Sequence, residues 1–167
     1  MKTILSILLF FLTTIYAKAQ LPSVVLTDIQ GNSVKVDALE NEGHPIIIDF
    51  FATWCKPCIR ELSAIADVYE DWQKETGVKL VAISIDKAQD AGKVKLLVNE
   101  NEWPYETVLL DKNSELKQAL SIQMIPYTLV IDGKGKIVYR HYGYTDGEEE
   151  ELLEIIKKSE SSKSNKL

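Results

Sequence analysis

Two cysteines, Cys55 and Cys58, carry the clearest chemistry in the sequence, and they are its only cysteines. They follow a short apolar run at 46–51, which indicates a buried strand, and precede a helical pattern that begins near Lys56. The start of a helix leaves backbone N–H groups unpaired at the positive end of the helix dipole. This setting favours a thiolate at Cys55, while Cys58, one turn into the helix, is placed to resolve a mixed disulfide. The pattern therefore predicts thiol–disulfide exchange.

Three other interpretations of the cysteine pair are weaker. A structural disulfide across so short a loop would remove little entropy from the unfolded chain. A zinc site needs further ligands, and His44 and His141 lack the spacing to provide them. A peroxidatic cysteine would need a preceding Pro and a Thr or Ser, where this chain has Ile48 and Ala52. We therefore predict a redox dithiol that uses neither a metal nor another cofactor.

Residues 1–19 are predicted to be a signal peptide and not part of the fold. A positive Lys2 and an apolar stretch over 4–15 precede a small-x-small cleavage site that ends at Ala19. A membrane-spanning helix needs about 20 apolar residues, and this stretch is shorter. We expect export into the periplasm with cleavage near Ala19, and an uncleaved segment that tethers the protein to a membrane is the alternative.

Length and charge limit the remaining function classes. Removal of the leader leaves about 148 residues, which suits a single domain. The formal charge of the whole chain is −6, and without Lys2 and Lys18 it becomes −8, so nucleic-acid binding has no electrostatic support. The end of the chain at 159–167 is rich in Ser and Lys and is predicted to be disordered. The folded domain is therefore expected to span 20–158.

The apolar pattern predicts strands that alternate with helices, followed by a hairpin and a last helix. Such an order indicates an α/β domain with helices on both faces of a mixed sheet. The expected strands lie at 24–26, 33–36, 45–51, 79–85, 107–110, 127–131 and 136–140, and the expected helices at 56–76, 88–101, 114–120 and 148–158.

This order, with Trp-Cys-x-Pro-Cys after the first central strand, resembles the thioredoxin fold. It is most similar to the exported TlpA/ResA-type branch of thioredoxin-like proteins, over roughly 22–157. The front hairpin at 26–34 resembles the N-terminal extension of that branch, and 88–110 resembles its central helix-strand insertion. Residues 124–128, Met-Ile-Pro-Tyr-Thr, match the place of its cis-proline loop. The resemblance implies a mixed central sheet flanked by helices, with these two additions.

The resemblance also implies a substrate-binding surface around the dithiol. It places Pro126 beside the cysteines with a cis peptide bond after Ile125, although an ordinary trans loop proline is the alternative. A cis bond would leave the Ile125 backbone free to pair with an extended substrate segment. An isoleucine before this proline is similar to the arrangement in reducing thioredoxins. Trp54 is expected to pack beside the thiols and shape the contact surface.

Two carboxylates could manage the proton of the second thiol. Asp49 lies in an otherwise apolar strand and matches the buried aspartate of thioredoxins. Glu61 follows Cys58 by one helical turn and matches a glutamate of the ResA-like branch. A desolvated carboxylate has a raised pKa and can take the proton from Cys58. Glu61 could also be a solvated helix residue, so the sequence leaves open which acid is the main acceptor.

Together, these features predict an exported protein-disulfide reductase that acts as a monomer on disulfide-bearing proteins. Cys55 would attack, Cys58 would release the product, and a membrane electron donor would recharge the dithiol. A DsbA-like oxidase and a redox-inert peptide-binding module are the alternatives. Cytochrome c maturation and general thiol repair are both roles in the resembling group, and the sequence does not choose between them.

Overall fold

The computed structural model describes residues 20–161 of the chain. The predicted signal peptide at 1–19 and the end of the chain at 162–167 lie outside the described residues. Within the described part, no helix combines the length and the apolar character needed to cross a membrane.

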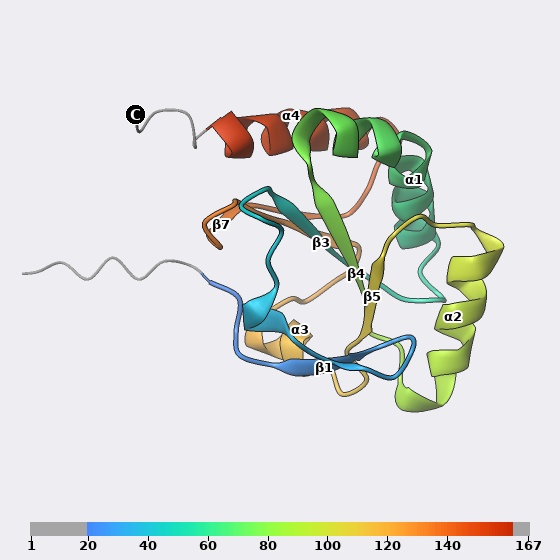
Figure 1. The fold of residues 1–167 in the computed structure, drawn as a ribbon. Helices are drawn as coiled ribbons and strands as arrows, with labels where there is room; N and C mark the ends of the chain where they lie inside the picture. Colours follow the sequence, from blue (N-terminus) through green and yellow to red (C-terminus); the bar gives the residue numbers. More distant parts are fainter. Residues whose placement is uncertain (1–19, 162–167) are drawn as a thin grey trace, which may run out of the picture.

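Between residues 20 and 161, seven strands form one mixed sheet (Figure 1). The strands are β1 (Val25–Asp28), β2 (Ser33–Lys35), β3 (Ile46–Phe51), β4 (Lys79–Ser84), β5 (Thr107–Leu110), β6 (Tyr127–Ile131) and β7 (Ile137–Tyr142). Their order across the sheet is β2-β1-β5-β4-β3-β6-β7. β3, β4 and β5 are parallel, whereas the hairpins β1–β2 and β6–β7 join them in antiparallel pairs. The predicted α/β architecture is confirmed.

Helices cover both faces of this sheet. The helices are α1 (Lys56–Thr76), α2 (Ala91–Glu100), α3 (Glu115–Ala119) and α4 (Glu148–Ser161). Apolar side chains of α1, α2 and α4 form one core cluster with one face of the sheet, and α3 contributes to a second cluster on the other face. In Figure 1, α4 and α1 lie together along one side, and α3 lies across the sheet from them.

The alternation of side chains along β3 decides which way its buried acid points. β3 is buried along its whole length, so successive side chains face opposite layers. Ile47 and Phe51 join the cluster with α1, and Asp49 lies between them on the same face of the strand. The register pairs Asp49 with Thr128 of β6. Both polar side chains therefore face the α1 layer.

Helix α1 has clear start and stop signals. Cys55 caps its first turn. It ends before Gly77, whose φ of 65° is in the left-handed region that favours glycine. A Cβ atom on Gly77 would lie 2.6 Å from His44 Nδ1, so a larger residue would also clash there. The apolar residues Leu62, Ile65, Tyr69 and Trp72 are buried at helical spacing, as predicted.

Several predicted boundaries shift by one or a few residues. The expected helix at 88–101 divides into a 3₁₀ turn, Ala88–Asp90, and α2. Strand β7 continues past the predicted end at Arg140, because Tyr142 still pairs with Tyr127 of β6.

The prediction of disorder over 159–167 is wrong at its start. Helix α4 continues to Ser161, and the side chain of Ser159 is buried with its hydroxyl donating to the Ile156 carbonyl at 2.7 Å. The folded domain therefore extends beyond 158, since packing against the domain supplies the stability that a Ser- and Lys-rich composition lacks.

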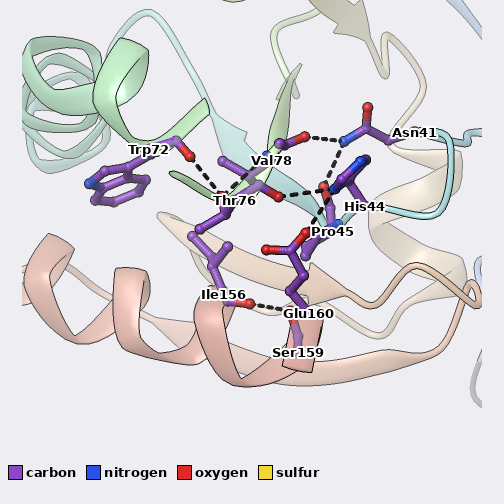
Figure 2. A network of polar contacts seen from close by, with 10 residues as sticks. Asn41, His44, Pro45, Trp72, Thr76, Val78, Ile156, Ser159 and Glu160 are labelled. Carbon is purple, nitrogen blue, oxygen red and sulfur yellow. Dashed lines mark hydrogen bonds and ion pairs between the residues drawn. The ribbon is translucent and has the colours of Figure 1, made fainter. Parts of the chain in front are cut away.

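The end of α4 is also tied to the loop before β3 (Figure 2). His44 Nδ1 lies 2.9 Å from Glu160 Oε1 and 3.2 Å from the Thr76 carbonyl, so this nitrogen is a donor to both acceptors. Asn41 Nδ2 donates to the Gly77 carbonyl at 2.8 Å. These contacts join the ends of α1 and α4 to one loop.

Candidate dithiol active site

The two cysteines form a disulfide at the start of α1. Cys55 precedes the helix, and the Cys58 N–H donates to Cys55 Sγ at 3.3 Å. Pro57 lies in the first turn, where its missing N–H costs nothing. Cys58 is fully buried, whereas Cys55 is 5% exposed. Cys55 is therefore the sulfur that a partner reaches first, and a backbone donor already faces it.

The turn that carries the dithiol is held by a buried carboxylate that sequence reasoning missed. Asp86 is 4% exposed and follows β4. The backbone N–H of Thr53 donates to Asp86 Oδ2 at 2.8 Å, and the Thr53 hydroxyl donates to Oδ1 at 2.7 Å. Ser84 Oγ also donates to Oδ2 at 2.8 Å. A usable signal existed, because parallel strands end at the same sheet edge and an acid after β4 lies near the turn after β3.

The surface beside the dithiol is apolar and exposed. Trp54 is 68% exposed, so most of its side chain faces solvent, and its packing beside the thiols stays a prediction. Met124 is 57% exposed. The peptide bond between Ile125 and Pro126 is cis, as predicted. Strand pairing between β6 and β3 begins only at Tyr127, so Ile125 precedes the paired part of β6.

Asp49 of β3 and Glu61 of α1 meet in the protein interior, bridged by one hydroxyl. Thr128 Oγ1 lies 3.1 Å from Asp49 Oδ2 and 2.8 Å from Glu61 Oε1. Asp49 is fully buried and Glu61 is 5% exposed, so the interpretation of Glu61 as a solvated residue is wrong. Among residues 20–161, Asp49 Oδ1 and Glu61 Oε2 have no hydrogen-bond partner. Thr128 was missed by the sequence reasoning, and its only signal is a hydroxyl within an apolar strand.

The arrangement of Asp49, Thr128 and Glu61 favours a proton on one of the two carboxyl groups. A threonine hydroxyl has one hydrogen to donate, so both contacts are hydrogen bonds only when one carboxyl is protonated and donates to Thr128. Burial raises the pKa of Asp49, and the hydrogen bond from Thr128 lowers it in part. Burial also raises the pKa of Glu61, with the nearby charge of Asp49 adding to it. The raised pKa predicted for Asp49 is thus confirmed in direction.

The described residues contain no group of three or more His, Cys, Asp or Glu side chains that could hold a metal ion. The two histidines contact two different glutamates. His44 pairs with Glu160, and His141 Nε2 lies 3.5 Å from Glu148 Oε2.

A disulfide at a helix start, next to a cis-proline loop on a mixed sheet, is the arrangement of the thioredoxin-like thiol–disulfide oxidoreductases. Sequence comparison agrees. The chain belongs to the AhpC/TSA family, whose sequence model matches residues 17–140.

Relatives and solved structures point to the same class. The chain is 30% identical over 151 residues to the thiol-disulfide oxidoreductase ResA of Halalkalibacterium halodurans, covering 89% of this chain and 82% of that protein. It is 30% identical over 122 residues to ResA of Bacillus cereus, covering 73% and 67%. The solution structure of a thioredoxin-like protein from Porphyromonas gingivalis is 53% identical, with a TM-score of 0.77 and coverage of 87% and 94%. The crystal structure of StoA from Bacillus subtilis is 26% identical, with a TM-score of 0.62 and coverage of 80% and 98%. The predicted fold, family resemblance and enzyme class are confirmed.

Proposed function

We propose that this thiol–disulfide oxidoreductase is an exported protein-disulfide reductase, in which Cys55 is the nucleophile and Cys58 the resolving thiol. The observation that carries the proposal is the buried Asp49–Glu61 pair of β3 and α1. Carboxylates there oppose additional negative charge on sulfur, which disfavours the thiolate and therefore the reduced state. A less stable reduced state lowers the reduction potential, as a reductase needs.

The first step takes place at Cys55, the more accessible of the two cysteines. The Cys55 thiolate attacks one sulfur of a substrate disulfide, a Cys55–substrate disulfide forms, and the other substrate sulfur leaves as a thiolate with its bonding electron pair. Trp54, Met124 and Ile125 offer an apolar surface and free backbone for an extended segment of the substrate.

The second step needs a proton acceptor. Cys58 gives its thiol proton to the acid pair, and its sulfur attacks Cys55 Sγ. The Cys55–Cys58 disulfide forms, and the second substrate sulfur leaves as a thiolate. The substrate has gained two electrons and the enzyme dithiol has lost them. A general base in such a step contributes about 10²–10⁴-fold to the rate.

The cellular setting is part of the same proposal. Cleavage near Ala19 would release the protein into the periplasm, where it would act as a monomer on disulfide-bearing proteins. A membrane electron donor would return two electrons to the disulfide after each cycle.

A redox titration of the Cys55–Cys58 couple against glutathione tests the direction of electron flow. We expect a potential nearer to that of thioredoxin, about −270 mV, than to that of DsbA, about −120 mV. A potential above about −150 mV would overturn the reductase and favour the oxidase. The helix N-terminus at Cys55 acts in that direction, because it stabilises the thiolate and therefore the reduced form. Failure of the reduced protein to reduce insulin disulfides would favour a peptide-binding module instead.

A further inference from the structure

A narrow cleft runs from the protein surface to Glu61, one acid of the buried pair. It lies between β7 and the start of α4, and Glu61 and Thr128 line it. Its free volume is about 20 Å³, which exceeds the roughly 10–15 Å³ that one water molecule needs. The dithiol mechanism above makes no use of this cleft.

Ile65 and Leu152 are the apolar side chains that line this cleft, and the others carry groups that can exchange protons with water. Those from β7, the following loop and α4 are Tyr139, His141, Tyr144, Glu148, Glu149 and Glu151. His141 Nε2 lies 3.5 Å from Glu148 Oε2, which joins β7 to α4. The Tyr144 hydroxyl donates to Glu149 Oε2 at 2.9 Å. The charges of Glu148 and Glu149 add to the rise in the pKa of Glu61, so they act electrostatically on the acid pair.

Thr128 connects the inner end of this cleft to the acid on the sheet. Its hydroxyl contacts a carboxylate oxygen of Asp49 on one side and of Glu61 on the other. A hydroxyl can accept one hydrogen while it donates its own. Asp49 itself does not line the cleft, whereas Glu61 does and retains an unpartnered Oε2 among residues 20–161.

We propose that Asp49, Thr128 and Glu61 form a relay that moves the proton of Cys58 into this cleft, where His141 and Glu148 pass it to solvent. The proposal rests on the exchange chemistry described above. Asp49 takes the proton from the Cys58 thiol and donates it to Thr128 Oγ1, as the hydroxyl hydrogen of Thr128 moves to Glu61 Oε1. Glu61 then releases this proton into the cleft. The S–H bond of Cys58 breaks at the start, only O–H bonds form and break afterwards, and one proton leaves for each disulfide formed.

The relay is tested by single-turnover stopped flow on the full reduced chain with dithiobis(nitrobenzoate) as the probe. The first nitrobenzoate thiolate reports attack by Cys55, and the second reports resolution by Cys58. We expect Thr128→Val to slow the second release about tenfold at neutral pH, and to leave the first release unchanged. Thr128→Ser keeps a hydroxyl and should restore the second release and its pH profile.

The exit is tested at low buffer concentration in multiple turnovers, with a dithiol such as dithiothreitol to re-reduce the enzyme, so that the proton must leave in every cycle. His141→Ala should lower turnover severalfold, and added imidazole should restore it. His44→Ala is the matched control, because His44 also pairs with a glutamate but lies in the network at the far end of α4 (Figure 2). This control should be neither slowed nor rescued.

Several outcomes would overturn the relay. A normal second release in Thr128→Val would do so, and so would equal impairment of Thr128→Val and Thr128→Ser, since that indicates a structural role. Normal turnover in His141→Ala, or impairment that imidazole does not rescue, would remove the exit through the cleft. The probe reaction does not depend on the direction of electron flow. A wild-type protein that shows the relay behaviour but fails to reduce insulin would therefore contradict the proposed reductase alone.

Discussion

Two buried acidic sites lie on the elements around the dithiol, and they differ in how their oxygens are satisfied. Asp86 receives hydrogen bonds on both carboxylate oxygens, from Thr53 and Ser84. Asp49 and Glu61 share a single hydroxyl, and each retains one oxygen without a partner in the described part of the chain. All three carboxyl groups are at least 95% buried, so burial alone does not distinguish the two sites.

The difference shows that the number of hydrogen-bond donors around a buried acid decides whether it can readily gain and lose a proton. Donors that point at a carboxylate stabilise its charged form, whereas desolvation without enough donors favours the neutral form. Asp86, which accepts hydrogen bonds on both oxygens, is suited to anchor the Thr53 turn. Asp49 and Glu61 are suited to gain and lose a proton during each cycle.

The largest expected effect comes from the cysteines themselves. Cys55→Ser should abolish disulfide exchange, because the attacking thiolate is lost. Cys58→Ser should trap a mixed disulfide with the substrate, because no thiol remains to resolve it. Non-reducing mass spectrometry after incubation with a disulfide-bearing protein measures both results. Trapping by Cys55→Ser and not by Cys58→Ser would reverse the two roles.

The comparison next predicts a kinetic contrast. Asp49→Asn should slow release of the mixed disulfide by about 10²-fold at neutral pH, because the amide cannot take the Cys58 proton. Stopped-flow kinetics should show a smaller effect on the initial attack. A silent Asp49→Asn with an impaired Glu61→Gln would assign the acceptor role to Glu61 alone.

A stability contrast follows from the anchor. Asp86→Asn replaces an acceptor oxygen with an NH₂ group and leaves a donor of Thr53 or Ser84 without its partner. We expect the free energy of unfolding to fall by about 2–3 kcal/mol, measured by urea denaturation of the oxidised protein. Asp49→Asn should raise stability at pH 8 under the same conditions, because it removes a desolvated ionisable group. If both variants lose the same stability, the proposed difference between the sites is incorrect.

The smallest effect is the dependence of stability on pH. The pKa values of Asp49 and Glu61 are raised on folding, to about 7 and about 9, so the folded chain binds more protons than the unfolded one above pH 4. Stability should therefore decrease as pH rises through this range. We expect urea denaturation to show this loss of stability between pH 6 and pH 9. The double variant Asp49→Asn with Glu61→Gln should show a flatter profile, and an unchanged slope would exclude the pair as its source.

Local patterns were enough to predict most elements of this fold. The run at 46–51 and the helical spacing after Lys56 reappear as β3 and α1, because a strand buried on both faces and an amphipathic helix each have a distinct apolar period. The predicted end of α4 was wrong, because the local composition is rich in Ser and Lys and does not reveal the contacts that Ser159 and Glu160 make in the fold. The signal peptide at 1–19 stays a prediction.

The sequence by itself determined the chemistry: a pair of cysteines at a helix start, a proline loop, and an acid in an apolar strand. Only the tertiary structure decided how the acids work. Thr128 lies 79 residues from Asp49 and 67 from Glu61 along the chain, and Asp86 lies 33 residues from Thr53. These contacts depend on the β3–β6 register and on the packing of α1, and a one-residue slip in register would turn Thr128 to the opposite face. No local pattern encodes that register, so the bridge between the two acids is a property of the fold.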